Sequence, residues 1–117
     1  MPILFIYGLH ELDLQKQNQL HNQTGDLRKN IAEILNINAS AISIYAPSTF
    51  IAISSTKEIV VFVEGLIEKP DRTLEIKEEI AKTIKRWLAD FVSNQDEEYP
   101  QIDVFVRSFD THKDGFA

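Results

Sequence analysis

The feature that most limits the fold of this 117-residue chain is a strand–helix–strand pattern that occurs twice. Apolar, β-prone runs occupy residues 2–9, 41–46, 59–66 and 102–106. Between the first and second runs, and again between the third and fourth, apolar residues recur every three or four positions. That spacing places them on one face of a helix. The order predicts an α+β fold of two tandem β-α-β repeats.

Each helical segment carries a single apolar stripe. Asp13 is suited to cap the first helix, because its carboxylate can accept hydrogen bonds from free N–H groups of the first turn. Gly25 marks a candidate bend in that helix, and Pro70 with Asp71 forms the turn before the second. The first stripe comprises Leu20, Thr24, Leu27, Ile31, Ile34 and Leu35, and the second comprises Ile76, Ile80, Ile84, Trp87, Leu88 and Phe91.

The remaining segments are predicted connections. Residues 50–53 are typical of a short strand or hairpin arm, and residues 93–100 of an acidic loop. Residues 108–117 are predicted to form a polar tail, with a turn signal at residues 113–115.

The two halves also match in sequence. Residues 5–9, FIYGL, align with residues 62–66, FVEGL, 57 positions later. The helical stripes keep this offset, which grows by three before the last strand, where Ile42 aligns with Ile102. We interpret the chain as one domain, residues 1–117, made by tandem duplication, with pseudo-repeats 2–55 and 59–110.

The repeats predict how the elements stack. A crossover between parallel strands is almost always right-handed, so both helices are expected on one face of a four-stranded mixed sheet. The strands are apolar on their second face too, which predicts that another subunit covers it. The alternative is that residues 47–58 and the C-terminal tail shield this face within one chain.

Composition excludes several classes of function. The net charge is -6 and no long basic run occurs, which disfavours binding to nucleic acid or to an anionic membrane. The absence of cysteine excludes disulfides and thiolate chemistry. His10, His21 and His112 lack the spacing of a metal site and are predicted to be surface residues. No metal and no cofactor is expected.

The apolar start of the chain is not predicted to be a targeting segment. It lacks a basic region and is followed by His10, Glu11 and Asp13. No run approaches the roughly 18 apolar residues that a membrane-spanning helix needs. We therefore expect a cytoplasmic protein with no membrane partner.

Pro2 is the best single candidate for a functional residue. Removal of Met1 is expected before a residue such as proline, and it would leave a secondary amine at the head of an apolar strand. A free α-amino group titrates near ~7.7–8.0, and apolar burial lowers its pKa further. A neutral amine could then take a proton from a carbon next to a carbonyl. The alternative is that Pro2 simply starts the chain.

The N-terminal Pro2, the two tandem repeats and the chain length together resemble the tautomerase superfamily, which includes macrophage migration inhibitory factor and 4-oxalocrotonate tautomerase. Over essentially the whole chain, the sequence is most similar to an uncharacterised, tautomerase-like bacterial branch. The resemblance implies a homotrimer that catalyses keto–enol tautomerisation of a small carbonyl acid, with Pro2 as general base. Shared segments are residues 48–51, STFI, residues 63–66, VEGL, residues 80–82, IAK, and a final Phe116.

Carried over by position, the resemblance implies two substrate-binding residues. Phe105 falls where the cytokine-like members place a tyrosine, so it keeps an aromatic wall but lacks the hydroxyl. Arg107 falls where they place an asparagine, and a guanidinium there could bind a substrate carboxylate through two hydrogen bonds. The alternative for Arg107 is a solvated strand end.

This sequence also departs from the pattern. The short bacterial members carry arginines where Leu12 and Ser43 stand here, and the cytokine-like lysine is replaced by residues 36–38, Asn-Ile-Asn. Two hypotheses follow: a Pro2-dependent tautomerase, or a catalytically inactive trimer of the same fold that binds a small ligand or a protein at its subunit interfaces.

Overall fold

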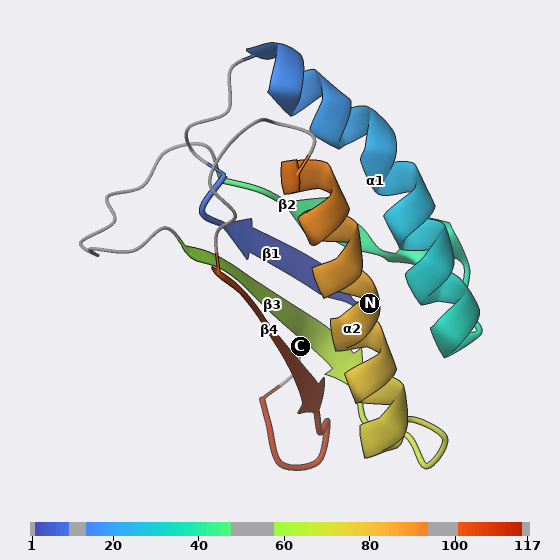
Figure 1. Cartoon of the computed structure of the whole chain (residues 1–117). Coiled ribbons are helices and arrows are strands. Elements are labelled where there is room, and N and C mark those ends of the chain that lie inside the picture. Colours follow the sequence, from blue (N-terminus) through green and yellow to red (C-terminus); the bar gives the residue numbers. More distant parts are fainter. Residues whose placement is uncertain (1, 10–13, 48–57, 94–100, 116–117) are drawn as a thin grey trace.

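The predicted strands pair into one mixed sheet, in the order β2-β1-β3-β4 (Figure 1). A computed structural model describes residues 2–9, 14–47, 58–93 and 101–115 of the chain. No helix within these ranges is both long and apolar enough to cross a membrane. The elements are β1 (Ile3–Tyr7), α1 (Leu14–Leu35), a short 3-10 helix η1 (Ala39–Ala41), β2 (Ser43–Tyr45), β3 (Glu58–Ile67), α2 (Leu74–Ser93) and β4 (Gln101–Phe109).

The pairing of the strands follows the duplication. β1 is parallel to β2, β3 is parallel to β4, and β1 runs antiparallel to β3. Each half of the chain is therefore a β-α-β unit with parallel strands, as predicted. Phe5 and Phe62, which are equivalent in the sequence repeat, lie directly opposite each other in the β1–β3 pair. A local twofold axis between the two halves would produce this register.

Both helices pack on the same face of the sheet (Figure 1). Alternate residues of the strands, such as Leu4 and Ile6 of β1, point into this layer and are fully buried. The helices contribute matching apolar side chains, including Leu27 and Ile31 of α1 and Ile84 of α2. Burying each such side chain stabilises the fold by about 1.5–3 kcal/mol. The predicted α+β architecture, with two helices on one face of a four-stranded mixed sheet, is confirmed.

Helix α1 is continuous through Gly25, the candidate position for a bend. The helix ends at Leu35, and Asn36 adopts a left-handed conformation with φ 54°. Asparagine tolerates this conformation better than most residues. The Ile37 amide donates to the Ala32 carbonyl oxygen at 3.0 Å, which satisfies one of the last carbonyls of the helix. The segment that replaces the cytokine-like lysine therefore serves as a helix cap.

The two glycines matched by the sequence repeat both have positive φ, 108° at Gly8 and 72° at Gly65. Gly65 lies where the register between β3 and β4 shifts, between Val63 and Leu66. A shift of this kind marks a β-bulge.

Strand β4 is longer than the sequence pattern indicates. Ser108 and Phe109 pair with Leu66 and Ile67 of β3, so the prediction that the polar tail begins at Ser108 is wrong. Pairing past the bulge satisfies backbone groups that a tail would leave to water. After the strand, the Asp114 amide donates to the carbonyl oxygen of Asp110 at 2.7 Å and closes a turn. The Asp13 cap, residues 50–53 and residues 94–100 lie outside the described residues.

Candidate functional site

Pro2 lies at the head of β1 and is buried. Its carbonyl oxygen accepts a hydrogen bond from the Ser43 amide at 3.2 Å, which ties it to the start of β2. On the other side of β1, the pairing of Ile3 with Glu64 brings Pro2 alongside the β3 bulge. The candidate base is thus buried and held between two strands.

The sheet face opposite the helices, which we call the open face, carries an aromatic residue from every strand at one level. Tyr45 pairs with Phe5, Phe5 with Phe62, and Phe62 with Phe105. We call these four residues the aromatic row. Ring centroids are 5.8 Å apart for Phe5 and Tyr45, and 5.5 Å apart for Phe62 and Phe105. Stacked aromatic pairs at such distances stabilise the face on which they lie.

The ends of the aromatic row are exposed to solvent. The exposed fraction is 55% for Tyr45 and 52% for Phe105. Tyr7 adds a fifth ring, 6.1 Å from Phe62 in an edge-on arrangement. A continuous aromatic strip across a whole sheet is the kind of surface that proteins use to bind another chain or a ligand.

Arg107 lies two residues beyond Phe105 on the same face, and it already has a partner. Its Nε and Nη2 atoms donate to Oε1 of Glu64 at 3.1 and 2.5 Å. The side chain of Arg107 is 71% exposed and that of Glu64 is 34% exposed. A ligand carboxylate would therefore meet a guanidinium whose charge is partly balanced by Glu64.

Sequence reasoning did not single out Glu64 as a partner of Arg107. The signal that could have found it is the alternation of β3 together with its parallel pairing to β4, which places Glu64 and Arg107 on one face. Phe105 and Arg107 lie two residues apart in β4. The strand of Pro2 is separated from them by β3.

A pair of carboxyl groups lies at the opposite end of β3 and β4. A hydrogen bond from its side chain to Asp103 is the main cause that raises the pKa of Glu58 above its ordinary value of 4.5. Desolvation and the negative charge of Asp103 raise this pKa further. Gln101 donates from Nε2 to Oδ2 of Asp103 at 3.1 Å. No sequence pattern predicts this pair, because Glu58 and Asp103 come together only through the pairing of β3 with β4.

The described histidines carry no indication of a metal site. His21 and His112 are exposed, as predicted. Within residues 2–9, 14–47, 58–93 and 101–115, no group of three or more potential metal ligands is found. His10 lies outside these ranges.

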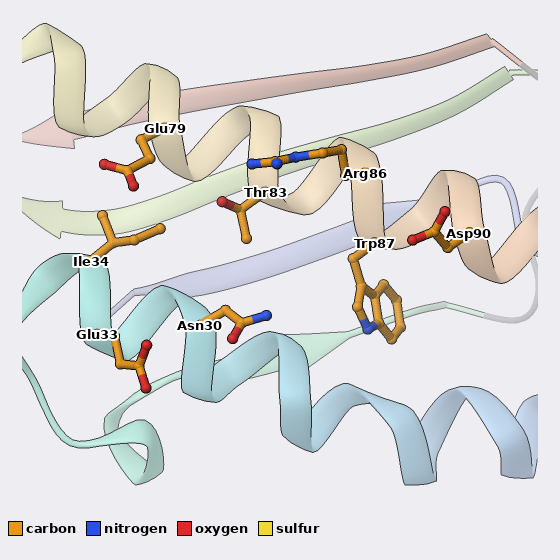
Figure 2. A pocket seen from close by; sticks show the side chains of 8 residues that line it. All are labelled: Asn30, Glu33, Ile34, Glu79, Thr83, Arg86, Trp87 and Asp90. Carbon is orange, nitrogen blue, oxygen red and sulfur yellow. The ribbon is translucent and has the colours of Figure 1, made fainter.

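A groove of about 610 Å³ lies between α1 and α2 (Figure 2). We call it the helix groove. Trp87 lines it and is partly buried, packed against the edge of the core. Its ring points across the groove toward α1. The lining includes Asn30, Glu33 and Ile34 of α1 and Glu79, Thr83 and Trp87 of α2.

No protein-family model matches the sequence, and no curated protein matches it either. Solved structures do match. A fused 4-OT (4-oxalocrotonate tautomerase), described as an asymmetric trimer, has a TM-score of 0.67 and 14% identity, covering 97% of this chain and 91% of that one. The macrophage migration inhibitory factor of Toxoplasma gondii has a TM-score of 0.62 and 14% identity, covering 92% and 90%.

A third structure is that of a protein inactivated by 2-oxo-3-pentynoate. It has a TM-score of 0.64 and 11% identity, covering 99% of this chain and 90% of that one. At these identities the likeness concerns the fold. The chain shares the α+β fold of these structures, which confirms the architecture that the sequence resemblance implies.

Proposed function

We propose that this protein is a tautomerase that uses Pro2, after removal of Met1, as the general base on a small carbonyl acid. The observation that carries this proposal is the burial of Pro2 at the head of β1, in a chain with the fold of tautomerases. An amine held in apolar surroundings favours its neutral form, which is the form that accepts a proton.

The reaction is a proton transfer in two steps. The Pro2 nitrogen takes a proton from the carbon next to the substrate carbonyl. The electrons of the broken C–H bond form a C=C bond, the π electrons of the carbonyl move to its oxygen, and that oxygen takes a proton from water, which gives the enol. The hydroxide that remains takes the proton from Pro2 and restores the neutral amine. In the reverse direction, the protonated Pro2 returns a proton to carbon.

Phe105 and Arg107 bind the substrate in this proposal. Phe105 supplies an aromatic wall, and Arg107 binds the carboxylate through its guanidinium. Because Glu64 contacts one edge of that guanidinium, the substrate carboxylate must either share Arg107 or displace Glu64. An exposed ion pair of this kind is worth only about 0–1 kcal/mol, so displacement is feasible.

The proposed assembly is a homotrimer in which the open faces pack together. Half-exposed aromatic residues at both ends of the aromatic row support this arrangement, because association would remove their apolar surface from water. β3 separates Pro2 from Phe105 and Arg107 within one chain. A site at a subunit interface would combine Pro2 of one subunit with β4 of its neighbour.

The first experiment is the intact mass of protein expressed at a low level. Loss of Met1 would free the Pro2 amine. The protein is then incubated with 2-oxo-3-pentynoate, an electrophile whose alkyne carbon can form a bond to a neutral amine while the adjacent carbon takes a proton. We expect one adduct per chain, located at Pro2 by peptide mapping, and none in Pro2→Ala under the same conditions.

Activity decides the proposal. Enol–keto conversion should be measured on a panel of 2-oxo acids, with Pro2→Ala as the matched variant and its oligomeric state as the folding control. Turnover that persists unchanged in folded Pro2→Ala would refute the role of Pro2. A mass that retains Met1 would also refute it, because the Pro2 nitrogen would be an amide.

The alternative function is a non-catalytic trimer that binds a small ligand or a protein at its interfaces. It is favoured by the ion pair that engages Arg107, together with Leu12 and Ser43 at the positions of the bacterial arginines. A trimer with a free Pro2 amine that converts none of the 2-oxo acids would support this alternative.

A further inference from the structure

The helix groove lies on the surface of the helix layer, and the sheet lies behind the two helices in Figure 2. It is therefore on the opposite side of the molecule from the open face. A ligand in this groove would not compete with the proposed association through the open face. The groove is independent of Pro2 and of the proposed chemistry.

One end of the helix groove is negative. Glu33 of α1 and Glu79 of α2 line it from opposite helices, and both side chains are exposed. Neither carboxylate forms an ion pair with another residue in the part of the chain that the structure describes. A basic side chain placed between the two helices could be attracted by both carboxylates.

The other charges of the groove leave it negative. Arg86 is the cation among the lining residues, and its Nε lies 3.4 Å from the carbonyl oxygen of Lys82 on its own helix. In Figure 2 its side chain runs along α2 rather than across the groove. Asp90 also lines the groove but has an interaction of its own, so its charge is left out of this balance. Glu33 and Glu79 still outnumber the guanidinium, and the protein as a whole carries a net charge of -6.

Trp87 gives the groove a second element of recognition. Its ring stacks on Phe91, with centroids 5.8 Å apart and planes 5° from parallel, which holds the ring in position. Arginine and lysine side chains bind to the face of an indole ring by cation–π attraction and by packing of their apolar stems. Carboxylates at one end and an indole ring farther along are together complementary to a chain with more than one basic side chain.

We propose that the helix groove binds an extended basic segment of a partner protein. One arginine or lysine of this segment lies between Glu33 and Glu79, and a second lies on Trp87. Glu79 and Trp87 are eight residues apart on α2, which corresponds to about 12 Å along the helix. An extended chain covers that distance in about four residues. The expected partner sequence therefore carries two basic residues about four positions apart.

The test uses the single tryptophan of the chain, Trp87, as a local reporter. Full-length protein at low salt is titrated with a blocked peptide, Arg-Ala-Ala-Ala-Arg, while tryptophan fluorescence is recorded and binding is measured in parallel by calorimetry. The same peptide with both arginines replaced by neutral citrulline is the ligand control. We expect saturable binding of the arginine peptide and no binding of the citrulline peptide.

Two charge-matched double variants separate the groove from general attraction. The combination Glu33→Gln and Glu79→Gln should weaken binding about tenfold, because two charge-assisted contacts are lost. The combination Glu75→Gln and Glu78→Gln removes the same charge at exposed positions of α2 outside the groove lining, and it should leave the affinity unchanged.

Three results would overturn the proposal: no binding by calorimetry, equal weakening in both double variants, or tighter binding of the polyamine spermine than of the peptide. The second result would mean non-specific attraction to an acidic protein. The third would assign the groove to a small polycation instead of a protein segment.

Discussion

Replacing Gly8 with alanine tests how closely β1 and β3 approach at the end of the strand that begins with Pro2. A Cβ atom at Gly8 would lie 2.3 Å from the carbonyl oxygen of Glu58 and 3.1 Å from the Cα of Ile59. Both are backbone atoms of the neighbouring strand, so no side chain can rotate away. The backbone also has φ 108°, which L side chains rarely adopt.

The magnitude follows from these two effects. Holding a non-glycine residue in such a conformation costs about 1–3 kcal/mol. Overpacking that forces the backbone to move costs about 1–3 kcal/mol more. Gly8→Ala should therefore lower the free energy of unfolding by about 2–6 kcal/mol, a large share of the about 5–15 kcal/mol typical of a domain.

Gly25 offers a matched control within the same chain. A Cβ atom there would meet nothing within 4 Å, and the residue lies inside the continuous helix α1. Because glycine in a helix interior is less favourable than alanine by about 0.5–1 kcal/mol, Gly25→Ala should stabilise the protein by that amount. The same chemical change is thus expected to have opposite signs at the two positions.

Urea denaturation followed by circular dichroism at a constant protein concentration measures both variants. A Gly8→Ala protein within 1 kcal/mol of the wild type would refute the close approach of β1 and β3. A Gly25→Ala protein that is less stable than the wild type would refute the reasoning about α1.

Four further substitutions test other parts of the structure. Ile84→Ala, at a fully buried core position, should lower the free energy of unfolding by about 2–5 kcal/mol, and a loss below 1 kcal/mol in urea denaturation would argue against the core packing. Because the pKa of Glu58 is raised above 4.5 in the folded protein, the free energy of unfolding should fall as the pH rises from 4.5 through the pKa of the folded state. Glu58→Gln should remove this fall, and a pH series of unfolding curves that is the same in the variant and the wild type would contradict the prediction. Arg107→Ala, made in the Phe105→Glu chain, should change the unfolding free energy by less than about 1 kcal/mol, since the Arg107 side chain is 71% exposed in the single chain; a larger loss by chemical denaturation would contradict a weak pair with Glu64. Phe105→Glu should abolish oligomers in analytical ultracentrifugation, because it places a charge in the proposed interface. The chain should stay folded, because the ring is 52% exposed in the single chain. Persistence of the oligomer would rule out the open face as its interface.

The family resemblance proposes Phe105 and Arg107 as site residues, and strand alternation predicts how they are arranged. Phe105 and Arg107 are two residues apart in a strand, so they share a face wherever that strand lies. The Gly8 and Gly65 match was visible in the repeat, and both residues have positive φ. A positive φ is a local property of the backbone that glycine adopts most readily, so a glycine repeated at equivalent positions can be recognised from the sequence alone.

The contacts between strands could not be found in this way. The ion pair between Arg107 and Glu64 depends on the register of β3 against β4, and the bulge at Gly65 shifts that register. The extension of β4 to Phe109 also depends on pairing between strands. Ser108 and Phe109 do not form an apolar run of their own, and they belong to a strand because they pair with Leu66 and Ile67 of β3. A one-residue change of register would move each of these side chains to the other face.

The helix groove shows the same division between sequence and structure. By itself, the sequence determined which segments are helices and strands, that they repeat, and that apolar stripes must be buried, because periodicity decides which side chains share a face. Only the tertiary structure decided that Trp87 is left partly exposed between α1 and α2, and that Glu33 and Glu79 line one groove. Those relations depend on how two helices settle on a twisted sheet, where packing of whole side chains, and not the local pattern, sets the distances.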